Sequence, residues 1–127
     1  CRPVPRVAEG QELRLNLGVH AMLDISDGIG SDLQHILDAS EVSAQIDRSA
    51  IPLSLALKRV CARQGWDPLA LAIGGGEDYE LLFTCTRQAE MLICVPHFVI
   101  GKITKRSFSS SAGPDWQVSG FDHFKKR

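Results

Sequence analysis

The stretch that most constrains the fold is AMLDISDG, residues 21–28. The run from His20 to Ile25 is short and apolar, which predicts a buried strand. Beyond Gly28, apolar residues recur at helical spacing, at Ile29, Leu33, Ile36 and Leu37. The sequence therefore predicts a strand that passes into an amphipathic helix through the acidic turn Ser26-Asp27-Gly28.

The rest of the chain continues this alternation of helices and strands. Further helices are predicted at Ala8–Leu17, from Pro52 to Gly65, and at Gln88–Val95. Strands are predicted at Val42–Asp47, Tyr79–Cys85, Val99–Thr104 and Trp116–Phe124, while Pro68–Ile73 is compatible with either helix or strand. Helices with one apolar face, mixed with strands, predict a layered α+β fold. No domain boundary is visible, so residues 1–127 are expected to form one domain.

Composition excludes several classes of protein. The chain has 127 residues and a net charge of −1, which leaves no electrostatic footprint for nucleic acid. No apolar run reaches the ~18 residues of a membrane span, so neither nucleic acid nor membrane is an expected partner. Four cysteines without a C-x-x-C motif predict reduced, mostly buried thiols and a cytoplasmic location. The chain begins at Cys1 without methionine, and we expect it to be part of a longer protein.

The acidic turn could carry chemistry. Asp24 and Asp27 lie three residues apart, and two such carboxylates can face one hard cation. Mg²⁺ prefers oxygen ligands and usually takes one or two carboxylates together with substrate phosphates. The N–H groups at the start of the next helix would favour an anion. The structural alternative is that Ser26 or Asp27 caps the helix and that Asp24 only ends the strand.

A second candidate stretch is GGGEDYE, residues 74–80. Three glycines allow a ligand to lie against the main chain, and three carboxylates follow within four positions. Such crowded like charges require a cation or a donor to offset them. The alternative is a flexible turn with a solvated acidic rim. P-loop and serine-hydrolase motifs are absent, and no side chain is assigned as catalytic.

Five segments, in a fixed order, resemble one family. Residues 21–28 resemble A-M-[IL]-D-[IV]-S-D-G, and residues 75–83 resemble G-G-E-D-Y-E-L-L-F. The segments RPVPRV (2–7), IGKIT (100–104) and GFDHF (120–124) also fit. These patterns resemble the C-terminal domain of thiamine-monophosphate kinases, in the superfamily of aminoimidazole ribonucleotide synthetase.

The resemblance implies a fold and an activity. The fold would be a three-layer α/β/α sandwich with a mixed sheet, like the C-terminal domain of aminoimidazole ribonucleotide synthetase. The enzyme would transfer the γ-phosphoryl group of ATP to thiamine monophosphate, giving thiamine diphosphate and ADP. An N-terminal ATP-binding domain, absent from this chain, would complete the site and support a homodimer. We therefore expect this chain alone to be inactive.

The resemblance also implies roles for particular residues. Asp24 and Asp27 would bind Mg²⁺, and Ser26 would contact ATP. The substrate would be bound by Glu77 and by Phe121, with Trp116 as the second choice for the aromatic contact. Two other interpretations remain open: a non-catalytic ligand-binding or dimerising domain of the same superfamily, and a sister synthetase with another small-molecule acceptor.

Overall fold

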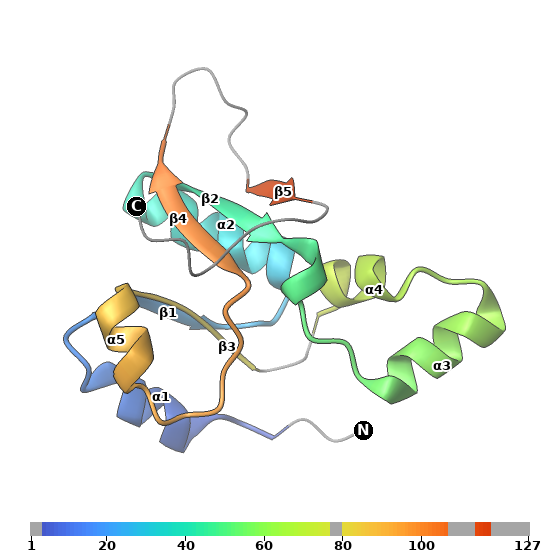
Figure 1. The fold of residues 1–127 in the computed structure, drawn as a ribbon, viewed down its shortest axis with the longest axis horizontal. Coiled ribbons are helices and arrows are strands. Elements are labelled where there is room, and N and C mark those ends of the chain that lie inside the picture. The colour runs from blue at the N-terminus through green and yellow to red at the C-terminus, as the bar shows by residue number, and fades with distance from the viewer. Residues whose placement is uncertain (1–3, 77–79, 107–113, 118–127) are drawn as a thin grey trace.

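Two small sheets and five α-helices form the part of the chain that the computed structural model describes, namely residues 4–76, 80–106 and 114–117 (Figure 1). The helices are α1 (Val7–Arg14), α2 (Ile29–Ser40), α3 (Leu55–Gln64), α4 (Pro68–Gly74) and α5 (Arg87–Leu92), with a 3-10 turn η1 at Arg48–Ala50. The strands are β1 (Val19–Asp24), β2 (Val42–Asp47), β3 (Leu81–Cys85), β4 (Gly101–Lys105) and β5 (Asp115–Gln117).

The strands pair in both directions. β1 and β3 form an antiparallel pair in which Asp24 lies opposite Leu81. The second sheet has the order β4-β2-β5, with β4 antiparallel and β5 parallel to the central strand β2. The expected α+β fold with a mixed sheet is confirmed. β2 has the predicted bounds, whereas the part of the predicted last strand after Gln117 lies outside the described residues.

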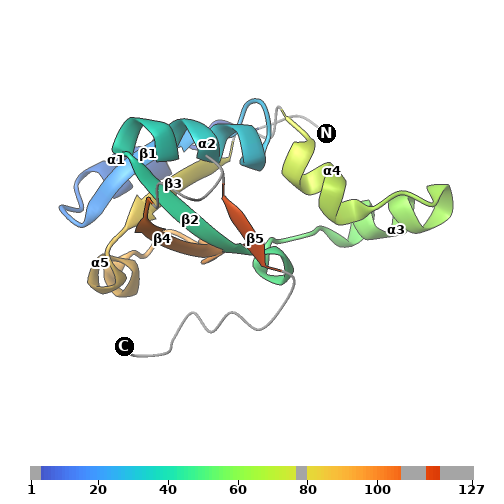
Figure 2. The ribbon, with the colours of Figure 1, turned by 90° about the horizontal axis from the view of Figure 1, so that it is seen from above.

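The core is built on the apolar face of α2. Figure 2 shows α2 lying above the strands, with α4 and α3 extending to the right of it. The buried cluster joins this helix to both sheets and consists of Ile25, Leu33, Ile36, Leu37, Ala44, Ile46, Ile51 and Leu82. Each fully buried aliphatic side chain of this kind contributes roughly 1.5–3 kcal/mol of burial free energy. The helical spacing seen in the sequence is thus confirmed as the spacing of the core.

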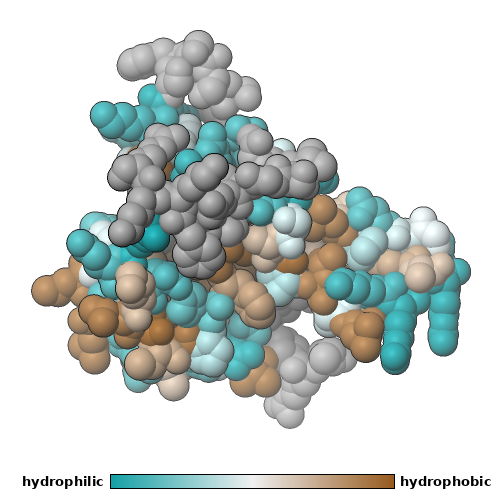
Figure 3. Space-filling model, viewed as in Figure 1, coloured by the Kyte–Doolittle hydropathy of each residue, from teal (hydrophilic) through white to brown (hydrophobic). Residues whose placement is uncertain are grey.

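Other large apolar side chains remain on the surface. Figure 3 shows apolar areas at the lower left, where α1 and α5 lie in that view. Exposed apolar residues on these helices and the loops that follow them include Leu15, Leu17, Met91, Leu92 and Phe98. They take no part in the buried cluster under α2. No helix among the described residues is long and apolar enough to span a membrane.

The helix ends correct one prediction and resolve one segment that the sequence left open. α3 begins at Leu55 and not at Pro52, because the Ser54 hydroxyl accepts a hydrogen bond from the Leu57 N–H at 3.1 Å and acts as the N-cap. It ends, as predicted, at Gly65, whose φ of 71° suits glycine. The ambiguous segment after Asp67 is the helix α4, because the Asp67 carboxylate accepts from the Leu69 N–H and Pro68 fits the first turn.

The cysteines partly match expectation. Cys61, Cys85 and Cys94 are free thiols, as predicted. Cys61 is buried, Cys85 is half-buried and Cys94 is exposed, so the prediction of mostly buried thiols is wrong for Cys94. Burial is the main factor that raises the pKa of the Cys85 thiol, with a smaller effect from the Glu90 carboxylate.

His97 connects α5 to the segment before β4. Its Nδ1 lies 2.6 Å from the Val95 carbonyl oxygen, and its Nε2 lies 2.8 Å from Glu90 Oε1. Both partners are acceptors, so the protonated imidazole donates to both of them. The Val95 carbonyl and then the Glu90 carboxylate raise the pKa of His97 above its usual value. This contact therefore stabilises the fold in the protonated form of the ring.

Glu90→Gln is expected to reduce the pH dependence of stability. A raised folded-state pKa gives stabilisation that is fully present below the unfolded pKa of about 6.5 and is lost as pH rises through the folded value. The pair is partly exposed, so the effect is about 1 kcal/mol or less. Urea unfolding of both proteins at about pH 5.5 and 8.5 measures it. Identical pH dependence in the two proteins would contradict the assignment.

Candidate functional site

The acidic turn lies where β1 leaves its sheet and α2 begins. Asp24 is the last residue of β1 and is exposed, whereas Ile25 is buried in the core. The Ile25 N–H donates to the Glu80 carbonyl oxygen at 2.8 Å, which ties the turn to the segment preceding β3. The strand and the core side chain together fix where the turn starts.

Asp32 holds the turn itself. Its Oδ2 accepts hydrogen bonds from three consecutive backbone N–H groups: Ser26 at 2.9 Å, Asp27 at 3.0 Å and Gly28 at 3.2 Å. The start of α2 has Gly28 as its N-cap residue and no side-chain cap, so the alternative in which Ser26 or Asp27 caps the helix is wrong. The three turn N–H groups are likewise already occupied by a carboxylate of the protein.

Close backbone approach brings the two candidate stretches together. Gly28 has a φ of 111°, and a Cβ atom there would lie 2.8 Å from the Ile73 carbonyl oxygen and 3.1 Å from the Gly75 carbonyl oxygen. On the opposite stretch, a Cβ atom on Gly76 would overlap the Ser26 carbonyl oxygen. Glycine is required at both places, because any side chain would push the segments apart. The acidic turn and the glycine stretch therefore form one site.

The N-terminal segment joins this site through Arg6. The Arg6 guanidinium donates to both carboxylate oxygens of Glu80, at 3.1 and 2.9 Å, and to Glu9 at 3.4 Å. The hydrogen bond and the charge of Glu80 are the main causes that raise the pKa of Arg6. The fork geometry orients Glu80 as well as neutralising it. Three segments far apart in the sequence thus meet here.

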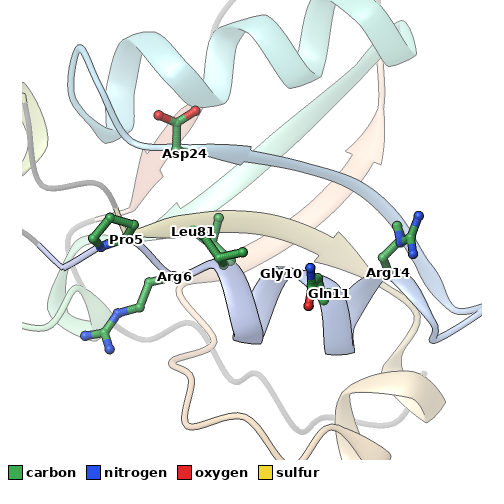
Figure 4. A pocket seen from close by; sticks show the side chains of 8 residues that line it. Pro5, Arg6, Gly10, Gln11, Arg14, Asp24 and Leu81 are labelled. Atoms are coloured by element: carbon green, nitrogen blue, oxygen red, sulfur yellow. The ribbon is translucent and has the colours of Figure 1, made fainter.

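The predicted metal ligands lie in different surroundings. Asp24 lines an open hollow of about 540 Å³ beside α1, together with Pro5, Arg6, Val7, Gly10, Gln11, Arg14 and Leu81 (Figure 4). Asp27 instead lies with Asp32 and His35, whose potential ligand atoms are all within 4.8 Å of one another. That group does not include Asp24. Asp24 thus ends β1 and Asp27 lies on the turn. Asp27, unlike Asp24, has potential metal-ligand atoms of other side chains within 4.8 Å.

The remaining predicted site residues divide between described and undescribed parts. Ser26 is half-buried on the turn. Trp116 packs against the core cluster, with its ring close to Gly30 in the first turn of α2. Glu77 and Phe121 lie outside the described residues.

Sequence reasoning missed Asp32, His35 and the pairing of Arg6 with Glu80. A signal for Asp32 was present: it is an acid on the otherwise apolar face of α2 and lies one turn after Gly28. Its partners are backbone N–H groups, which have no sequence signature. The partner of Arg6 lies 74 residues away, and only the folded chain reveals it.

Comparison with known proteins gives one consistent picture. Residues 3–110 match the family described as AIR synthase related protein, C-terminal domain. The thiamine-monophosphate kinase of Haemophilus influenzae is 38% identical over 141 aligned positions, covering 98% of this chain and 42% of that protein. The corresponding kinase of Escherichia coli K12 is 39% identical, covering 97% of this chain and 40% of that protein. The chain thus spans about two fifths of the length of these curated relatives.

Solved structures are similar to this chain as well. The crystal structure of thiamine-monophosphate kinase from Stenotrophomonas maltophilia is 36% identical with a TM-score of 0.75, covering 91% of this chain and 36% of that one. A structure described as AaThiL complexed with AMPPCP and TMP is 31% identical with a TM-score of 0.67, covering 81% of this chain and 31% of that one.

Gly76→Ala is expected to destabilise the fold by about 1–3 kcal/mol, because the new methyl group meets the Ser26 backbone. Gly74→Ala is the matched control, since no atom lies within 4 Å of a Cβ there and alanine suits a helix end. Urea unfolding measures both variants. Equal stability of the two variants would show that the glycine stretch does not pack against the acidic turn.

Proposed function

The chain belongs to the family described as AIR synthase related protein, C-terminal domain, and from this premise we propose that it is the C-terminal domain of a thiamine-monophosphate kinase. In this proposal residues 1–127 form one domain, and the N-terminal ATP-binding domain lies elsewhere in the protein. The γ-phosphoryl group of ATP is transferred to thiamine monophosphate, giving thiamine diphosphate and ADP. The observation that carries the proposal is the joining of the acidic turn to the glycine stretch through Gly28 and Gly76.

Three roles, shared among five residues, follow from this proposal. Asp24 and Asp27 hold Mg²⁺, Ser26 contacts ATP, and Glu77 and Phe121 bind the thiamine substrate. The donor types suit the ion, because Mg²⁺ prefers carboxylate oxygens and both Asp24 and Asp27 are exposed. Imidazole is a poorer ligand for Mg²⁺, so His35 is not included.

The chemistry needs little from the protein beyond positioning and charge. A phosphate monoester has its second pKa near ~6, so the acceptor is already largely an oxyanion at neutral pH. No general base is required, which agrees with the absence of an assigned catalytic side chain. Bound Mg²⁺ supplies charge neutralisation for the transferring phosphoryl group. The residues of this chain align the reactants by keeping the acidic turn rigid.

The arrangement around Glu80 supports this alignment. Arg6 offsets one of the clustered carboxylates, and the Glu80 carbonyl fixes Ile25 next to the turn.

The proposed partners are ATP, thiamine monophosphate and a second copy of the full-length protein. The proposed location is the cytoplasm, where nucleotide substrates and reduced thiols are found.

The test uses the full-length protein that contains this chain. Incubated with thiamine monophosphate, ATP and Mg²⁺, it is expected to yield thiamine diphosphate, detected by chromatography. Asp24→Asn is expected to lower the rate at least about 100-fold, because it removes a metal ligand. Asp38→Asn is the matched control, since Asp38 is exposed on α2 and pairs only with Arg106 among the described residues.

Two outcomes would count against the proposal. A folded full-length protein without product would leave the fold unchanged and move the function to another acceptor or to a binding role. Full activity in Asp24→Asn would reject the metal assignment. The 127-residue chain alone is expected to give no product.

A further inference from the structure

Asp32 is one of two acidic residues in the buried part of the described chain, with 3% of its surface exposed. The hydrogen bonds of its side chain all go to backbone N–H groups of the turn, through the single atom Oδ2. An ordinary N-cap side chain satisfies one or two N–H groups at the start of its own helix. Asp32 instead reaches back from the first turn of α2 to three peptide groups that precede the helix.

This arrangement fixes the direction of two side chains. The N–H groups of Ser26, Asp27 and Gly28 all point at one oxygen, and the preceding Ile25 N–H is bound by the Glu80 carbonyl. Four consecutive peptide groups are therefore held. A backbone held in this way leaves Ser26 and Asp27 only their own side-chain rotations. Hydrogen bonds to a carboxylate are about twice as strong as those between neutral groups, so the turn is preorganised before any ligand arrives.

The same contacts prevent the backbone of the turn from binding an anion. Consecutive N–H groups that converge on one point form a typical anion-binding concavity. Here the Asp32 carboxylate fills it, so a substrate phosphate has no access to these three donors. The turn therefore offers substrate its side chains and not its backbone, and the added negative charge favours a cation beside Asp27.

We propose that Asp32 is the positioning residue of the phosphoryl-transfer site: it acts through Ser26 and Asp27, setting the affinity for the divalent cation without contacting the thiamine substrate. This inference rests on the proposed function for the roles of those two residues. It differs from a purely structural role of Asp32, which would change stability alone. The two are separated by measuring metal affinity and substrate affinity independently.

The experiment compares Asp32→Asn with the wild-type full-length protein and with Asp38→Asn, which changes the same residue type on the exposed face of α2. Asparagine keeps the size of the side chain but removes the charge that gathers the three N–H groups. The Mg²⁺ concentration for half-maximal activity is expected to rise about 10-fold or more in Asp32→Asn. The KM for thiamine monophosphate is expected to stay within about twofold, and Asp38→Asn is expected to match the wild type.

Two readouts do not depend on activity. Mn²⁺ binding, measured by electron paramagnetic resonance, is expected to weaken about 10-fold in Asp32→Asn. Hydrogen exchange in a peptide covering residues 25–31 is expected to be slow in the wild type and faster in the variant. Fast exchange in the wild-type turn would overturn the proposal even if Asp32→Asn failed to fold.

The outcomes separate this inference from the proposed function. Faster exchange with unchanged Mg²⁺ and Mn²⁺ dependence would show that Asp32 is only structural and overturn the proposal. Weakened Mn²⁺ binding in a protein that does not phosphorylate thiamine monophosphate would support positioning by Asp32 and reject the proposed acceptor. Absence of Mn²⁺ binding in the wild type would overturn both the positioning role and the metal assignment.

Discussion

The contact on which the site depends is the backbone-to-backbone packing of residues 26–28 against residues 73–76. Gly28 and Gly76 make it possible, because a Cβ atom at either position would meet a carbonyl oxygen of the other segment. The contact places the end of α4 against the start of α2, and the core cluster beneath α2 then holds both in place. Loss of either glycine would separate the two stretches that carry the acidic residues.

The packing of residues 26–28 against residues 73–76 brings acidic side chains close together. The acidic residues of the two stretches would repel one another if left unpaired. Arg6 offsets part of this charge by binding Glu80 through two hydrogen bonds, whereas Asp32 adds a buried carboxylate that three peptide N–H groups stabilise. Asp24 and Asp27 remain exposed and without such partners in the described residues. These two are the carboxylates proposed above as the ligands of Mg²⁺.

Local features of the fold were predictable because their causes are local. The β1–α2 unit follows from an apolar run and from helical spacing, and β2 has the predicted bounds because alternation over six residues is unambiguous. The start of α3 was misplaced because proline and serine both suit a helix start, and the Ser54 hydroxyl contact decides between them. The site was predicted as two separate motifs, while their contact, the Arg6–Glu80 pair and the role of Asp32 were not.

The sequence by itself determined the α+β class, the acidic turn between a strand and a helix, and the family resemblance, because these depend on residue types and spacings within short segments. The tertiary structure alone decided which segments meet. It packs Gly76 against the Ser26 backbone and pairs Arg6 with Glu80, which lies 74 positions away. It also brings the Asp32 side chain, from the first turn of α2, to the backbone N–H groups of the acidic turn. The physical reason is that these contacts involve backbone groups and long-range approach, which have no periodicity or motif in a linear sequence.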